Sequence, residues 1–146
     1  MKIIFDYRVL KHKNYTGVEN YAKNILENIK EKYHLIVAKP KSSNKYLSHL
    51  WTHLLLPFFN GDILFCPANI APIFVPKSKK LVITIHDVAF LTYPESFSLF
   101  FRLYYKFVVT INIKREDKII TVSNYSKKSI ENFYPNAKGK IEVIYL

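Results

Sequence analysis

The sequence has little cysteine, glycine, proline or arginine and no long apolar run. Its one cysteine, Cys66, cannot form a disulfide within the chain, so nothing calls for an oxidising compartment. Three glycines and seven prolines exclude a collagen-like or linker-dominated chain. No stretch reaches the roughly 18 uncharged apolar residues that a membrane-spanning helix needs. Asp6 and Arg8 interrupt the apolar opening, which excludes a secretory signal peptide. The expected compartment is therefore the cytoplasm.

Apolar residues and positive charge are both abundant. The 146 residues are 49% hydrophobic and 16% aromatic, enough for a folded domain of ordinary size. Lysine and arginine number 22 against 11 acidic residues, a net charge of +11, which favours an anionic partner or simply reflects a lysine-rich composition. Only Arg8, Arg102 and Arg115 are arginines. Because specific base recognition relies on arginine, and no motif for it occurs, we expect no nucleic-acid partner.

Short apolar runs alternate with helical patterns along the chain. Strands are expected at 2–9, 35–38, 62–66, 81–86, 118–123 and 140–146, and helices at 16–33, 46–56, 97–115 and 124–134. The strands are continuously apolar, as strands buried on both sides are. This predicts one α/β domain, a Rossmann-like doubly wound fold with a mostly parallel sheet and helices on both faces. Ligands of such folds bind beyond the carboxyl ends of the strands.

Two of these ends carry candidate binding residues. Gly17 begins the first helix and would let a ligand approach its free N–H groups, while Thr16 and Glu19 have the spacing of a capping box. The two interpretations are compatible, and the dinucleotide-binding pattern GxGxxG is absent. His86 ends the fourth strand, and Asp87 follows it. They could contact a sugar hydroxyl, or the pair could only hold the loop in place.

Other candidates have structural interpretations. His49 and His53 have the i, i+4 spacing of a metal pair, but no third ligand is evident, so interface or surface histidines are predicted and no metal. Cys66 is expected to pack within its strand. A polar stripe recurs every four residues through the apolar segment 96–115, at Ser98, Arg102, Lys106, Thr110 and Lys114. This segment is either buried against the sheet with only its stripe in water, or an interfacial helix on an anionic membrane.

Taken in order, these segments resemble the N-terminal half of family 4 glycosyltransferases of the GT-B type, particularly mannosyl- or rhamnosyltransferase-like members. The resemblance covers essentially the whole chain. It is carried by the opening strand with Asp6 and Arg8, then TGVENY (16–21), WTHLLLP (51–57), DILFCPAN (62–69), TIHDVAFLTYPESFS (84–98), TVSNYSK (121–127) and IEVIY (141–145). The block HD…YPE followed by TVSxxSK is its most specific part.

The resemblance implies a retaining, metal-independent transfer without a cofactor. A sugar would pass from a nucleotide-sugar donor to a glycan or lipid-linked acceptor at the cytoplasmic face of the membrane. It assigns Thr16 and Gly17 to the donor diphosphate and His86, as the catalytic residue, to the transferred sugar. The remaining assignments are to the acceptor (Arg8, Asp87, Tyr93 and Glu95) and to anionic headgroups at a peripheral membrane contact (Arg102, Lys106 and Lys114).

The resemblance also assigns residues 1–146 to one half of a GT-B fold. They correspond to the acceptor-side domain, and the C-terminal donor-binding domain is absent from them. We therefore expect this chain to be inactive, or nearly so, without such a domain. The alternative expectation is a stand-alone basic module that binds a membrane surface or a ligand and transfers nothing.

Overall fold

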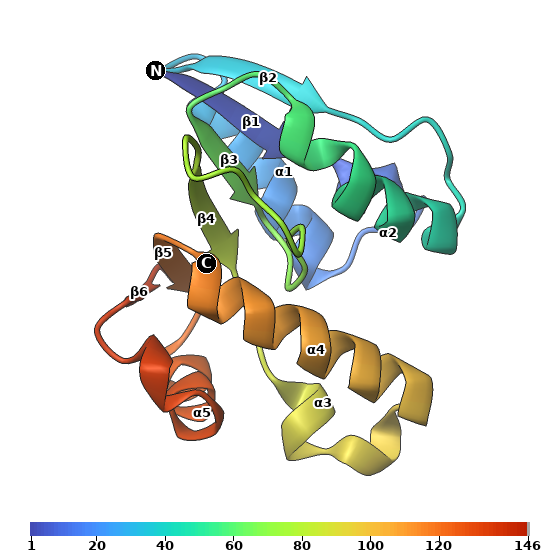
Figure 1. Ribbon diagram of the computed structural model, residues 1–146, viewed down its shortest axis with the longest axis vertical. Helices are drawn as coiled ribbons and strands as arrows, with labels where there is room; N and C mark the ends of the chain where they lie inside the picture. Colours follow the sequence, from blue (N-terminus) through green and yellow to red (C-terminus); the bar gives the residue numbers. More distant parts are fainter. Residues whose placement is uncertain (146) are drawn as a thin grey trace.

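A computed structural model describes residues 1–145 and shows one six-stranded, all-parallel sheet (Figure 1). The strand order is β2-β1-β3-β4-β5-β6. The strands are β1 (Lys2–Asp6), β2 (His34–Ala38), β3 (Ile63–Cys66), β4 (Lys80–Thr84), β5 (Lys118–Thr121) and β6 (Ile141–Val143). The predicted α/β, Rossmann-like class is confirmed, and the sheet is entirely parallel rather than mostly so.

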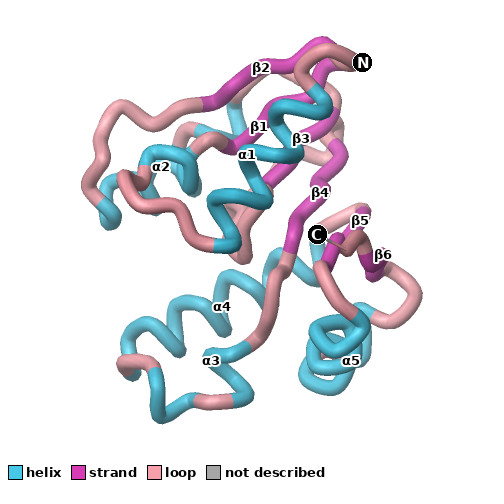
Figure 2. The backbone as a smooth tube through the Cα atoms, turned by 180° about the vertical axis from the view of Figure 1, so that it is seen from behind, coloured by secondary structure: helices cyan, strands magenta, loops and turns pink. Residues whose placement is uncertain are grey.

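Helices cover both faces of this sheet, as expected (Figures 1 and 2). The helices are α1 (Gly17–Ile29), α2 (Lys45–Leu54), α3 (Ala89–Thr92), α4 (Leu99–Arg115) and α5 (Asn124–Phe133). Side chains of β1 alternate between the two cores: Ile3 and Phe5 pack with Ala22 of α1, while Ile4 joins the larger cluster that includes Ile113 of α4. The alternation follows from the two-residue period of a strand.

The element boundaries differ from expectation mainly at the carboxyl ends of strands. The first strand ends at Asp6 instead of residue 9, and Arg8–Lys11 forms a short 3-10 helix. The Asp6 carboxylate accepts a hydrogen bond of 3.0 Å from the Arg8 N–H, which turns the chain out of the sheet. The one-turn helix α3 lies in a segment that shows no helical periodicity. The last strand is shorter than predicted, and its expected end, Leu146, lies outside the described residues.

Of the two placements open for the segment 96–115, neither describes all of α4. Its C-terminal half is buried against the sheet through Val108, Val109 and Ile113. Its N-terminal half projects beyond the strands (Figure 1), and here the expectation of burial with only a polar stripe in water is wrong. Large apolar side chains are exposed there together with the basic ones: Leu99, Phe100, Leu103 and Phe107. Across residues 1–145, no helix is both long and apolar enough to cross a bilayer.

A buried carboxyl group at the end of α4 makes the stability of this fold sensitive to pH. Burial raises the pKa of Glu116 from 4.5 to about 7, although Lys140 lies 3.3 Å away. A pKa that is higher in the folded than in the unfolded chain means that stability falls as the pH rises from 4.5 through 7. We expect Glu116→Gln to raise the melting temperature by about 2–6 °C at pH 8 and by much less at pH 5. A gain that is the same at both pH values would contradict this origin.

Candidate functional site

The strand order reverses between β1 and β3, and a cavity of about 260 Å³ lies beyond their carboxyl ends. The chain leaves β1 toward β2 on one side and continues from β3 toward β6 on the other. Such a switch point is where doubly wound sheets bind ligands, because the loops after the two strands diverge and leave a crevice. The polar lining comes from the loop after β1, from α1, α2 and α4, and from the loop after β3: Arg8, His12, Thr16, Glu19, Lys45, Ser48, His49, Asn69 and Tyr105.

An ion pair at the end of β1 supplies one residue of this lining, Arg8. Arg8 is 6% exposed and Asp6 is fully buried, with 3.7 Å between Arg8 Nη2 and Asp6 Oδ2. Arg8 also donates to the carbonyl oxygen of Ile70 at 3.2 Å, which ties β1 to the loop after β3. Burial raises the pKa of Asp6, against the lowering effect of Arg8. The Nε–H of Arg8 is buried and has no hydrogen-bond partner among residues 1–145.

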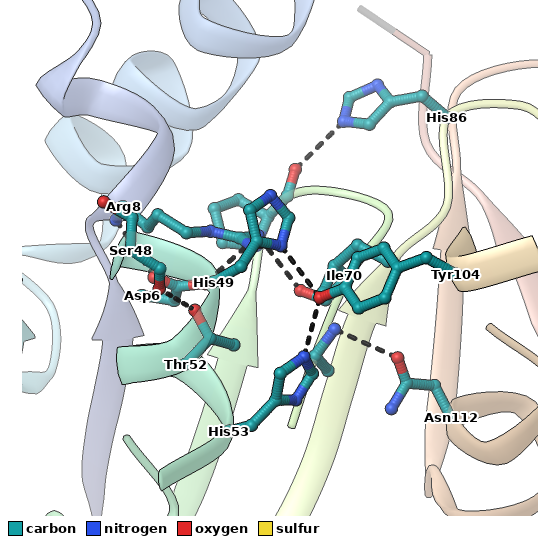
Figure 3. A network of polar contacts seen from close by, with 12 residues as sticks. Asp6, Arg8, Ser48, His49, Thr52, His53, Ile70, His86, Tyr104 and Asn112 are labelled. Atoms are coloured by element: carbon teal, nitrogen blue, oxygen red, sulfur yellow. Dashed lines mark hydrogen bonds and ion pairs between the residues drawn. The ribbon is translucent and has the colours of Figure 1, made fainter. Parts of the chain in front are cut away.

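A directed chain of hydrogen bonds continues from Arg8 into the space between α2 and α4 (Figure 3). Arg8 Nη1 lies 3.3 Å from Nδ1 of His49, and the Tyr104 hydroxyl lies 2.9 Å from the same nitrogen. The hydroxyl is also 2.7 Å from Nε2 of His53, whose Nδ1 accepts from the N–H of Ile73 at 3.3 Å. Because an arginine and a backbone N–H can only donate, both histidines carry their proton on Nε2.

With these tautomers, the direction of each hydrogen bond in the series is fixed. His53 Nε2–H donates to the Tyr104 oxygen, and the Tyr104 hydroxyl donates to His49. Burial and the nearby Arg8 charge lower the pKa of His49 to about 3, and burial raises that of Tyr104 to about 12, so both are neutral at pH 7. No hydrogen bond within residues 1–145 uses the Nε2–H of His49, which remains available to a ligand. Of the predicted alternatives, interface or surface histidines, the half-buried contact of both rings with Tyr104 places them between α2 and α4.

The N-terminus of α1 forms one wall of the cavity. The predicted capping box is present: the Glu19 carboxylate accepts from the Thr16 N–H at 2.9 Å and from the Thr16 hydroxyl. These bonds, with His12 at 3.0 Å, lower the pKa of Glu19 to about 2 despite its desolvation. Gly17 does not have a positive φ, and a Cβ placed on it would meet no atom within 4 Å. The fold therefore does not require glycine here, and the space in front of it is open.

His86 lies beside the cavity rather than in its lining. Its Nε2–H donates to the carbonyl oxygen of Pro67 at 2.9 Å, and its backbone N–H donates to Asn69 Oδ1 at 2.8 Å. Its ring meets Tyr21 edge-on, with 5.0 Å between the ring centres. Burial lowers the pKa of His86, so the ring is neutral with the lone pair on Nδ1. Asp87 makes no hydrogen bond to the imidazole and instead accepts from the N–H of Ala89 at 2.9 Å.

The structure brings some of the predicted site residues together and leaves others apart. Arg8 and Thr16 line the cavity, and Gly17 adjoins it. Asp87, Tyr93 and Glu95 are exposed on the segment after β4 and do not line it, while Arg102, Lys106 and Lys114 lie along α4. The sequence did not predict a ligand-binding role for the lining residues of α2. The i, i+4 spacing of His49 and His53 was the one signal that could have drawn attention to this helix. Cys66 is fully buried in β3, as predicted.

No metal centre is evident in the part of the chain that the structure describes. Among residues 1–145, no three or more histidine, cysteine, aspartate and glutamate side chains are grouped so that they could hold an ion. The groups that line the cavity are the buried Arg8 guanidinium, the Lys45 ammonium group, two imidazoles, several hydroxyls, the Asn69 amide and the Glu19 carboxylate, which is already bonded to Thr16 and His12. Such a set recognises phosphate and hydroxyl oxygens by hydrogen bonding.

The chain is similar to the O-antigen chain mannosyltransferase RfbU of Salmonella typhimurium (strain LT2), with 32% identity over 101 residues. The matched region is 68% of this chain but 27% of that protein, so the chain spans about a quarter of the relative that it matches. No family model and no solved structure matches the chain. The similarity establishes a relationship to a glycosyltransferase, an enzyme that has a sugar donor and an acceptor as its substrates.

Proposed function

We propose that this chain is the acceptor-side domain of a retaining glycosyltransferase of the GT-B type. A nucleotide-sugar donor would supply the sugar, and a glycan or lipid-linked molecule would accept it. The observation that carries the proposal is the cavity at the switch point between β1 and β3, in a chain related to a mannosyltransferase. Catalysis would also require a donor-binding domain, which residues 1–146 do not include.

Within this proposal, the residues that line the cavity and those that lie beside it have different roles. Thr16 and Gly17 receive the donor diphosphate, supported by the open space at Gly17 and the positive end of the α1 dipole. His86 contacts the transferred sugar through Nδ1, since its Nε2–H is bonded to Pro67. Arg8 serves the acceptor, as do Asp87, Tyr93 and Glu95 from the exposed segment after β4.

A second candidate role is peripheral docking to an anionic membrane at the cytoplasmic face. It is favoured by the membrane surface, defined here as Leu99, Phe100, Leu103 and Phe107 together with Arg102, Lys106 and Lys114 on α4. None of the ion pairs within residues 1–145 includes these three basic side chains. An exposed apolar face mixed with unpaired positive charge is typical of interfacial helices. A module with this surface alone would bind membranes without transferring a sugar.

The donor assignment can be tested by binding. We expect weak binding of a nucleoside-diphosphate sugar by the isolated chain, measured by isothermal titration calorimetry over a panel of UDP- and GDP-sugars. Gly17→Arg should reduce this binding at least about tenfold, because its side chain fills the open space in front of α1. Asn136→Arg, on an exposed 3-10 turn, adds the same charge elsewhere and is the control. Undiminished binding in Gly17→Arg would contradict the diphosphate assignment.

A further inference from the structure

His12 and Glu19 form a hydrogen-bonded pair in the lining of the cavity at the sheet edge, and the proposed function gives this pair no role. Nδ1 of His12 lies 3.0 Å from Glu19 Oε1. The backbone of His12 is held as well, because its N–H donates to the Val9 carbonyl oxygen at 3.4 Å, where the 3-10 helix after β1 ends. The Glu19 side chain is buried, whereas that of His12 is 57% exposed. The pair therefore presents an oriented imidazole to the cavity.

The bonds of Glu19 determine which nitrogen of His12 can meet a ligand. Burial raises the pKa of Glu19, but its bonds to Thr16 and His12 outweigh this effect and hold the pKa at about 2. Because a carboxylate can only accept, His12 carries a proton on Nδ1. No hydrogen bond within residues 1–145 uses Nε2, at the far edge of the ring. A neutral His12 offers a ligand a lone pair there, and a protonated His12 offers an N–H.

His12 is also the lining residue whose charge can respond to a ligand near neutral pH. The other titratable side chains of the lining keep one charge state between pH 5 and pH 8: Arg8, Glu19, Lys45, His49 and Tyr105. The two cations and the Glu19 carboxylate stay charged. Burial lowers the pKa of His49 to about 3 and raises that of Tyr105, so these two stay neutral. Histidine ordinarily changes its charge within this range, and an anion beside the ring favours the protonated form.

We propose that His12, oriented by Glu19, binds the diphosphate of the nucleotide-sugar donor as an imidazolium, so that donor binding takes up a proton. This inference rests on the proposed function, which assigns the diphosphate to Thr16 and Gly17. Glu19 connects the two places directly, since Oε2 accepts from the Thr16 N–H and Oε1 is bonded to His12. A diphosphate at the start of α1 would therefore lie next to the His12 ring.

An unsatisfied donor elsewhere in the lining supports a ligand with anionic oxygens. Arg8 is 6% exposed, and its buried Nε–H has no hydrogen-bond partner among residues 1–145. A buried donor without a partner costs free energy, which a ligand oxygen would recover. Arg8, Lys45 and a protonated His12 give three positive charges against the one carboxylate of Glu19. This balance matches the two negative charges of a nucleotide-sugar diphosphate.

Calorimetry of UDP- and GDP-hexoses on the intact chain, in two buffers of different ionisation enthalpy, measures the proton uptake. The diphosphate of these ligands is esterified at both ends and does not titrate near neutral pH, so a proton taken from the buffer goes to the protein. We expect an uptake of about half a proton at pH 7. The affinity should rise about three- to tenfold between pH 8 and pH 6, because the lower pH favours the imidazolium.

Three variants identify the group that takes up the proton. His12→Gln retains a side chain that can bond to Glu19 but cannot be protonated, so it should abolish the uptake and make the affinity independent of pH. Glu19→Gln can still complete the capping box but lacks the charge that favours the imidazolium, so it should reduce the uptake. His34→Gln is the matched control, because His34 is exposed at the amino end of β2 and does not line the cavity. It should behave like the native chain.

The outcomes separate this inference from the function on which it rests. Binding without proton uptake, or with an uptake that persists in His12→Gln, would overturn the role of His12 and leave the donor assignment standing. A loss of affinity in His12→Gln that is equal at pH 6 and pH 8 would also overturn it, because the ring would then contribute only contact. If no UDP- or GDP-hexose binds at either pH, the donor assignment and this inference fail together.

Discussion

Arg8→Met is expected to lower the free energy of unfolding by about 3–5 kcal/mol, because it leaves the Asp6 carboxylate buried without a partner charge. For a chain of this length, the melting temperature should fall by about 10–15 °C. The loss should be larger at pH 8 than at pH 5. Burial already raises the pKa of Asp6, and without the guanidinium the carboxyl group would be protonated more readily as the pH falls. Chemical denaturation at the two pH values measures both effects.

The double variant Asp6→Asn/Arg8→Met provides the control for this explanation. It removes both charges but retains an oxygen that can accept from the N–H of residue 8, as Asp6 Oδ1 does at 3.0 Å. We expect it to be more stable than Arg8→Met alone, and its difference in stability from the native chain to change little between pH 5 and pH 8. If the two variants lose the same stability, the packing of the Arg8 side chain, and not its charge, is what the fold requires.

The second large effect concerns the membrane surface. Changing Arg102, Lys106 and Lys114 to glutamate should reduce the affinity for anionic vesicles, measured by co-sedimentation, at least about 100-fold. Each basic residue near an anionic membrane contributes about 1 kcal/mol to the binding free energy. The remaining binding should fall further as salt is added, since the attraction is screened. Vesicles of neutral phosphatidylcholine should bind the native chain much more weakly than vesicles with phosphatidylserine.

A second triple variant with the same net charge distinguishes the effect of the membrane surface on vesicle binding from the effect of the total charge. Lys23, Lys30 and Lys32 are exposed on or just after α1, which covers the opposite face of the sheet (Figure 2). Changing these three to glutamate should leave vesicle binding within about threefold of the native chain, since α4 is untouched. Equal losses in the two triple variants would mean that the +11 charge acts as a whole, and the membrane surface would have no special role.

The sequence predicts the sheet well because its strands are recognisable one at a time. A run such as LVITI is short, almost entirely apolar and rich in β-branched residues, which is typical of a strand buried on both sides. The end of β1 was harder to predict, because apolar residues resume at Val9 and Leu10 after Asp6 and Arg8. There the Asp6 side chain takes the N–H of Arg8 that a longer strand would offer to the sheet, a local hydrogen bond that hydrophobic periodicity does not report.

Less of the candidate site could be predicted, because it depends on which helices meet. Thr16 and Glu19 are close in sequence, and their capping box is readable from spacing alone. The contact of His49 and His53 with Tyr104 joins residues more than fifty positions apart, and nothing in either segment identifies the other. For α4, periodicity showed a polar stripe but could not show that half the helix extends past the sheet that would have buried it.

The Tyr104 hydroxyl has a consequence for any ligand that enters between α2 and α4. One phenolic oxygen is bonded at 2.9 Å and 2.7 Å to two successive turns of the facing helix, so the two helices are fixed in register and in spacing before a ligand arrives. Because the space between α2 and α4 is already formed, a ligand loses little binding free energy to rearrangement of these helices when it enters. A bulky ligand would have to separate the two helices, and that movement would break both bonds at once.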